Sequence, residues 1–217
     1  MENLSRSRPL RFPVASTLLR VIIIAFGLTI ASTGVSFYMK SGLGVDAFSV
    51  FCGGLSKLLH VTFGLSLQIS SFFLIAIIAI IDRSLLGIGT VMHALLMGVF
   101  IDAIARFGLI PASTNPLQSL AYVAVGVILV GFGLAIYIKA GLGSGALDAT
   151  MFLLHKKLRI HLKWVKIGMD FTLALVGFLL GGALGVTTVV TVLLTGPIIQ
   201  RSMRLIDSVF PPAGREP

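Results

Sequence analysis

Long apolar stretches, interrupted by short polar segments, dominate the pattern of this chain. Four of them approach the ~20 residues that a helix needs to cross the hydrocarbon core of a bilayer, and they cover 18–39, 63–81, 117–138 and 167–184. Backbone groups in lipid must be paired within the protein, which leaves only helices and closed barrels. Because these runs do not alternate apolar and polar residues as barrel strands do, the pattern predicts an all-α, polytopic transmembrane helix bundle.

One sequence pattern occurs twice along the chain. Residues 27–44 read GLTIASTGVSFYMKSGLG and residues 126–143 read GVILVGFGLAIYIKAGLG, with seven of eighteen positions identical. A second pair of segments, 86–102 and 184–200, shares eight of seventeen positions. Shared hydrophobicity does not keep Gly, Tyr, Lys and Thr in register, so the chain is predicted to be a tandem duplication, which is typical of transporters.

The repeats divide the chain into parts. Each repeat holds a long helix, a Lys-x-Gly-Leu-Gly break, a short helix (46–59 or 146–158) and two longer helices. A segment with Pro111, Asn115 and Pro116 reads as a linker. We therefore expect a basic cytoplasmic leader at 1–16, repeat one at 17–108, the linker at 109–117, repeat two at 118–206 and a disordered tail at 207–217.

The topology depends on whether the short helices cross the membrane. If both cross, the chain has eight spans in two parallel four-helix repeats. If both re-enter, it has six spans and the repeats are inverted. Either arrangement places 14 of the 17 basic residues on one side, so the positive-inside rule does not separate them. Eight spans are preferred, because residues 43–59 would reach roughly 25 Å as a helix.

Composition supports a membrane protein. Hydrophobic residues make up 56% of the chain, charged residues 12%, and the mean hydropathy is +1.03. The net charge of +9 comes from basic residues between spans, which orient loops toward the cytoplasm and contact acidic lipid, so nucleic acid is not an expected partner. We expect a multi-pass protein of the bacterial inner membrane with both termini cytoplasmic. The single cysteine, Cys52, excludes an intrachain disulfide.

The Lys-x-Gly-Leu-Gly breaks are the best candidates for a substrate site. A glycine-rich turn that opens a helix presents free N–H groups and the positive end of the helix dipole, and a nearby lysine adds a cation. This arrangement favours an anionic group on a solute. Alternatively, the lysines snorkel to the interface and Asp46 caps its helix. The candidate substrate-binding residues are Tyr38, Lys40, Gly42, Gly44, Asp46, Tyr137, Lys139, Gly141, Gly143 and Asp148.

Two polar residues in the last helix of repeat one are candidates for coupling to an ion or proton. His93 lies in the middle of the span and Asp102 lies nine residues further on, so they face opposite sides of the helix. A packing histidine is the alternative for His93. Lys166 and Asp170 have the spacing of a surface ion pair. The chain has no signature of a hydrolase, metalloprotease or nucleotide-binding enzyme, and no metal or cofactor is expected.

These motifs resemble the YczE/YyaS/YitT family of bacterial integral membrane proteins. The resemblance rests on the paired Lys-x-Gly-Leu-Gly breaks, each followed by an aspartate, and on the Leu-Gly-x-x-Thr…Gly-x-x-Ile-Asp stretch at 86–102. It implies a helical membrane protein and a role in transport. In that family Pro or Trp often precedes the aspartate, whereas Val45 precedes Asp46 here and residues 144–147 precede Asp148.

The sequence as a whole predicts a transporter or permease, not an enzyme, for a small polar or anionic solute that binds between the two repeats. A non-transporting accessory subunit is the alternative, followed by an intramembrane lipid-handling enzyme. Membrane lipids and a small-molecule solute are the expected partners, and a homo-oligomer remains open.

Overall fold

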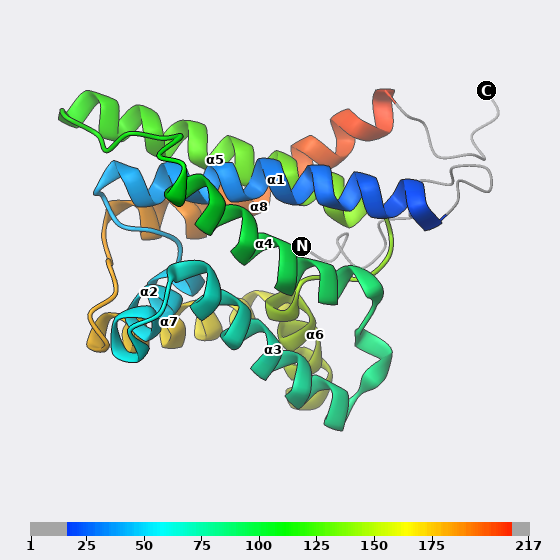
Figure 1. The fold of residues 1–217 in the computed structure, drawn as a ribbon. Coiled ribbons are helices and arrows are strands. Elements are labelled where there is room, and N and C mark those ends of the chain that lie inside the picture. The colour runs from blue at the N-terminus through cyan, green and yellow to red at the C-terminus, as the bar shows by residue number, and fades with distance from the viewer. Residues whose placement is uncertain (1–16, 210–217) are drawn as a thin grey trace.

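The computed structural model describes residues 17–209, and this part of the chain is entirely helical (Figure 1). The predicted all-α bundle is confirmed. The expected leader and most of the expected tail lie outside the described residues, while 207–209 still belong to the last helix. The α-helices are α1 Thr17–Ser41, α2 Ala47–Leu59, α3 Phe63–Ile81, α4 Ile88–Arg106, α5 Pro116–Lys139, α6 Ala146–Leu158, α7 Leu162–Leu179 and α8 Val186–Val209, with a 3₁₀ turn Arg83–Leu85.

Side-chain caps fix where several helices begin. The Asp46 carboxylate accepts a hydrogen bond from the Ser49 backbone N–H. The Thr62 side chain likewise accepts one from the Leu65 backbone N–H. Asn115 caps α5, whose first residue is Pro116. Each cap satisfies a backbone donor that the first turn of a helix leaves free. The breaks that were read from the sequence therefore coincide with helix ends.

Five helices, α1, α3, α4, α5 and α8, are long and apolar enough to cross a membrane. Many large apolar side chains on the outside of the bundle are exposed, as a lipid-facing surface requires; Phe73 is 66% exposed and Ile80 85%. α7 has 18 residues but carries charged side chains. α2 and α6 have 13 residues each, a length of roughly 20 Å that falls short of a bilayer core.

The helices form two layers (Figure 1). In one layer α4, α1, α5 and α8 lie in a row, with α1 against α5 at its centre. In the other layer α2, α3, α6 and α7 form a ring, each packed against two neighbours. Close packing of α3 on α4 joins the two layers along one edge. The main apolar core includes Ile24, Leu28, Val127 and Val130 from α1 and α5.

Glycines bring α1 and α5 into backbone contact in antiparallel orientation. A Cβ on Gly27 would lie 2.8 Å from the Gly133 carbonyl oxygen, and one on Gly34 would lie 2.7 Å from the Gly126 carbonyl oxygen. Gly27, the earlier glycine in α1, thus lies against Gly133, the later one in α5, and Gly34 lies against Gly126. Small residues allow such approach between membrane helices. The first helices of the two sequence repeats therefore run in opposite directions.

Both ends of each short helix contact a single connection of the other half. At the start of α2 the Val45 N–H donates to the Ala183 carbonyl, and near its end Lys57 Nζ donates to the Gly181 carbonyl over 2.6 Å. For α6, the Leu142 carbonyl just before it accepts from the Gly89 N–H. Near its end, Lys156 Nζ lies 2.6 Å from Asp82. Each short helix therefore begins and ends near one connection.

These contacts favour the topology in which the two short helices re-enter, over the one in which both cross. Eight parallel spans would place Lys156 and Asp82 on opposite sides of the membrane, and likewise Lys57 and Gly181. The observed pairs exclude that arrangement. The preference for eight spans overestimated the length of the first short helix, because residues 43–46 belong to the glycine break and are not helical.

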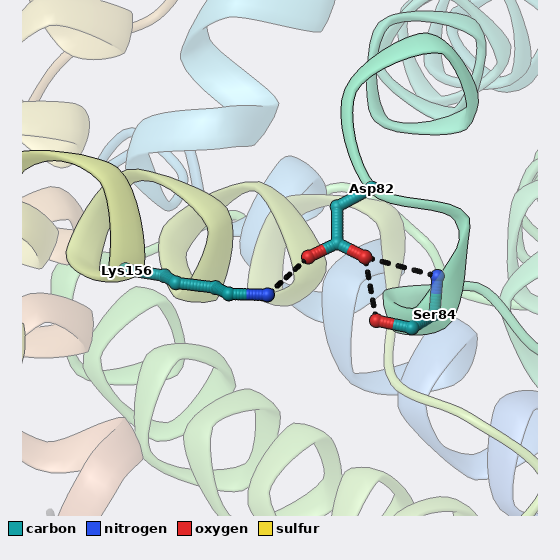
Figure 2. Close-up of polar contacts among 3 residues, drawn as sticks. All are labelled: Asp82, Ser84 and Lys156. Atoms are coloured by element: carbon teal, nitrogen blue, oxygen red, sulfur yellow. Dashed lines mark hydrogen bonds and ion pairs between the residues drawn. The ribbon is translucent and has the colours of Figure 1, made fainter.

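Asp82 forms a local network in the connection between α3 and α4 (Figure 2). Its carboxylate accepts from Lys156 Nζ, from the Ser84 hydroxyl and from the Ser84 backbone N–H. The ammonium of Lys156 first, and then the two Ser84 donors, lower the pKa of Asp82 from 3.8 to about 2. The network ties the end of α6 to the α3–α4 connection.

The Asp82 network predicts a pH-dependent contribution to stability. Because the pKa of Asp82 is lower in the folded state, its contribution is complete above about pH 4 and is lost as the pH falls through about 2. Lys156→Met is expected to lower the melting temperature at pH 6, and the difference from wild type should close toward pH 2. Thermal unfolding between pH 2 and 6 measures this, with Lys157→Met as the control. A difference that stays constant with pH would contradict the pairing.

Candidate substrate cavity

The glycine breaks after α1 and α5 dock against the starts of α8 and α4, which belong to the other half of the chain. The Thr187 N–H donates to the Leu43 carbonyl over 3.0 Å, and the Gly89 N–H donates to the Leu142 carbonyl over 2.8 Å. A Cβ on Gly44 would lie 2.5 Å from the Gly185 nitrogen. Gly44 and Gly143 also have positive φ angles of 92° and 127°, which disfavour any residue but glycine.

A cavity of about 260 Å³ lies next to these breaks, between the two layers. The first turns of α2 and α6 face it, together with parts of every other helix. Its titratable side chains come from the start of α2 and from α4, α6 and α7. The lining includes Asp46, His93, Ser144, Gly145, Asp148, Leu162, Lys166, Asp170, Thr191, Val192, Thr195 and Ile199.

Three carboxylates and one lysine give the cavity an acidic character. Lys166 Nζ lies 3.0 Å from Asp170, so these two charges neutralise each other. Asp46 is held by the Ser49 N–H as a helix cap. Asp148 has no hydrogen-bond donor from any residue between 17 and 209. Asp46 and Asp148 therefore have no lysine or arginine ion-pair partner within residues 17–209.

His93 completes the polar lining opposite α6. A Cβ on Gly145 would lie 3.5 Å from an Asp148 carboxylate oxygen and 3.6 Å from His93 Nε2, so the missing side chain of Gly145 leaves these groups near each other. The His93 ring packs at 5.4 Å, centroid to centroid, on the Tyr137 ring. His93 Nδ1 is buried and has no partner within the described chain. The structure thus places Asp46, Asp148 and His93 in one cavity.

The other candidate residues lie outside the lining. Tyr38 and Tyr137 are fully buried, and their hydroxyls have no partner among the described residues. Lys40 lies in the last turn of α1, and its carbonyl accepts from the Ser113 N–H. Lys139 is buried and pairs with Asp207 of α8 over 2.5 Å. The glycines Gly42, Gly44, Gly141 and Gly143 shape the breaks through positive φ angles. Neither lysine of the breaks faces the cavity.

Asp102 forms an interhelical cap. Its carboxylate accepts from the Gly64 N–H over 2.8 Å and from the Thr62 hydroxyl over 2.5 Å, at the start of α3. These contacts give Asp102 a role in joining α4 to α3, away from the cavity that holds His93. Lys166 and Asp170 show the opposite outcome, because the sequence suggested a surface pair and they line the cavity. The position of Asp170 inside the predicted span 167–184 was the signal for a buried role.

The Lys139–Asp207 pair predicts a stability effect at the ends of α5 and α8. Lys139 is 5% exposed and Asp207 36%, so Lys139→Met should lower the free energy of unfolding by about 1–2 kcal/mol. Asp207→Asn should cost less in the Lys139→Met background than in wild type, because the pair is already broken. A double-mutant cycle of thermal unfolding measures this coupling. Fully additive effects of the two substitutions would contradict the pair.

Comparison with known proteins agrees with the resemblance read from the sequence. A model described as a family of unknown function, DUF6198, matches residues 18–204. The chain belongs to this family. The match covers all eight helices except Thr17 of α1 and residues 205–209 of α8.

The relatives of this DUF6198 family member include curated bacterial proteins. The uncharacterized membrane protein YczE of Bacillus subtilis (strain 168) is 31% identical over 183 residues, 84% of this chain and 81% of the relative. An uncharacterized protein of Haemophilus influenzae (strain ATCC 51907 / DSM 11121 / KW20 / Rd) is 25% identical over 86% of this chain and 84% of its own. The uncharacterized protein YyaS of B. subtilis is 28% identical over 88% and 96%. No solved structure matches. These relatives support a membrane protein.

Proposed function

We propose that this protein is a secondary transporter of the bacterial cytoplasmic membrane that carries a small cationic solute through the cavity between its two halves. The observation that carries the proposal is the pair of carboxylates, Asp46 and Asp148, that face the cavity without a lysine or arginine partner. Buried charges in a membrane protein are costly and typically functional. A cationic solute replaces the anionic one suggested by Lys40 and Lys139, because those lysines face elsewhere.

The opposed orientation of the halves supports a transporter. The sequence repeats, the antiparallel α1–α5 crossing and the matched docking of the breaks fit a duplicated, inverted design. In several transporter folds, broken helices from two inverted repeats build a midplane site in this way. With six spans, both ends of the described chain and most basic residues fall on one side, which the positive-inside rule assigns to the cytoplasm.

An asymmetry between the halves supports movement. α3 packs closely on α4, where a Cβ on Gly98 would clash with the Gly64 backbone, whereas α7 and α8 scarcely touch. If the halves exchange these two arrangements, the α7–α8 gap closes and an α3–α4 gap opens. α8 contains Pro197, which removes one backbone hydrogen bond of the helix beside the cavity. This exchange would give the cavity access to each side in turn.

A ligand screen tests the proposal. The purified protein in nanodiscs is heated with matched sets of amines, quaternary ammonium ions, carboxylates and sulfonates. Amines or quaternary ions are expected to raise the melting temperature, since a ligand at 100 times its Kd adds about 2.7 kcal/mol. Uptake of the binding solute into proteoliposomes then shows transport. Stabilisation by anions alone, or binding without any flux, would contradict the proposal.

An intramembrane lipid-handling enzyme remains the second candidate, because several polar side chains converge in one cavity. Nucleophilic catalysis needs a hydroxyl or thiol within hydrogen-bond reach of a base, and no Ser, Thr or Cys side chain in 17–209 bonds to His93. Mass spectrometry of native lipids incubated with the protein distinguishes the two. Turnover of a lipid that stops in His93→Gln would favour the enzyme over the transporter.

A further inference from the structure

α7 and α8 both line the cavity but make no substantial contact with each other, which leaves an opening between them, here called the α7–α8 mouth. Among its lining residues, Val192 of α8 is the one that is exposed, at 38%. The other lining residues of the described chain are buried or half-buried. α7 contributes Leu162, Lys166 and Asp170, which are spaced by four and share one helix face. α7 and α8 thus turn their facing sides to the cavity instead of packing on each other.

The packing of the layers explains why the mouth lies there. α3 begins with Phe63 and Gly64, and Gly64 lets α4 approach to backbone contact at Gly98. α7 begins with Leu162 and Lys163, so the second residue of the helix is a long side chain instead of glycine. α3 and α4 therefore close one edge of the cavity, whereas the corresponding edge between α7 and α8 stays open. Within residues 17–209, α8 packs substantially on α5 alone.

The surface around the mouth is apolar. On α8, Val189 is 61% exposed and Leu193 65%, and on α7 Phe171 is 67% exposed. α8 is long and apolar enough to cross a membrane. In the six-span arrangement α7 crosses beside it, so these side chains would face lipid. The mouth at Val192 therefore opens sideways into the hydrocarbon region rather than into water. The lining combines apolar side chains, among them Leu162, Val192 and Ile199, with the carboxyl groups of Asp148 and Asp170.

We infer that the solute is an amphipathic cation, which enters from the bilayer through the α7–α8 mouth. This inference rests on the proposed function and names its substrate class. The ammonium group would lie at Asp148 and Asp46, and the apolar tail would lie between α7 and α8, in contact with Val192. A solute that partitions into lipid reaches this mouth directly, whereas a fully hydrophilic cation does not.

The test compares two cations that share a trimethylammonium head, hexyltrimethylammonium and tetramethylammonium, on the protein in phosphatidylcholine nanodiscs. Burial of the hexyl tail is expected to give it an affinity at least about tenfold higher than that of tetramethylammonium. Val192→Phe, which narrows the mouth, should slow association of hexyltrimethylammonium by about tenfold. The matched control is Val189→Phe, which adds the same ring on the same helix at a lipid-facing position outside the lining and should leave the rate unchanged.

The possible outcomes separate the two proposals. Equal affinity for both cations, with rates that Val192→Phe does not change, overturns the lateral route and leaves the acidic cavity intact. Binding of neither cation, while the wild-type protein unfolds cooperatively, overturns the lateral inference together with its cationic site. A Val189→Phe variant that slows association as much as Val192→Phe also overturns it, because the effect would then come from the surface of α8 and not from the mouth.

Discussion

Replacing Asp148 by asparagine is expected to weaken binding of a cation in the cavity by about tenfold to a hundredfold. Asp148 lines the cavity and has no donor among the described residues, so its charge is available to a ligand. Asparagine has the same shape without the charge. Because the substitution also removes an unpaired carboxylate from an apolar surround, the melting temperature should stay the same or rise. Binding of hexyltrimethylammonium in nanodiscs measures the effect.

The control for this prediction is Asp82→Asn. Asp82 is also a carboxylate, but it is paired with Lys156 and lies in the α3–α4 connection, outside the cavity lining. Its substitution should lower stability slightly and leave the affinity unchanged. Equal affinity of wild type and Asp148→Asn, with both proteins folded, would show that the carboxylate does not face the ligand.

Replacing Gly133 by alanine is expected to cost about 3 kcal/mol of unfolding free energy. A Cβ at this position would lie 2.5 Å from the Gly27 carbonyl oxygen and 2.6 Å from the Ala31 nitrogen, and both of these are backbone atoms of α1. The two helices would have to separate along the central contact of their layer. Thermal or denaturant unfolding of the reconstituted protein measures the loss.

Gly168→Ala provides the matched control. Gly168 lies in α7 with no atom within 4 Å of an added Cβ, so the same substitution there should be neutral or stabilise the helix by up to about 1 kcal/mol. A Gly133→Ala protein as stable as Gly168→Ala would contradict the close α1–α5 crossing.

The helices and the breaks follow from local chemistry, which is why the sequence predicts them. Long runs of apolar residues predict the long helices. Asp46, Asn115 and the glycines with positive φ angles fix where helices begin or end. The repeated Leu-Gly and Thr residues at 86–90 and 184–188 have a reason that only the structure shows. They form the backbone surface that the glycine break of the opposite half contacts.

Neither the membrane topology nor the sign of the charge in the cavity could be predicted from the sequence. Charge counts are equal in both topologies, so the choice depended on contacts between distant segments, such as Lys156 with Asp82. Lys139 looked available to a solute because its partner lies far along the chain. Lys139 pairs with Asp207, 68 residues away. Tertiary pairing of this kind leaves no local signal, so the acidic character of the cavity emerged only from the fold.

Sided labelling of single cysteines tests the central claim, that two oppositely oriented halves enclose one cavity. Arg83→Cys, Lys157→Cys and Ala183→Cys are each introduced into a Cys52→Ser background and labelled in oriented vesicles with a membrane-impermeant maleimide. All three positions are exposed. The account predicts that Arg83→Cys and Lys157→Cys react from the same side and Ala183→Cys from the other. Labelling of Arg83→Cys together with Ala183→Cys, on the side opposite Lys157→Cys, would mean that the short helices cross and would contradict it.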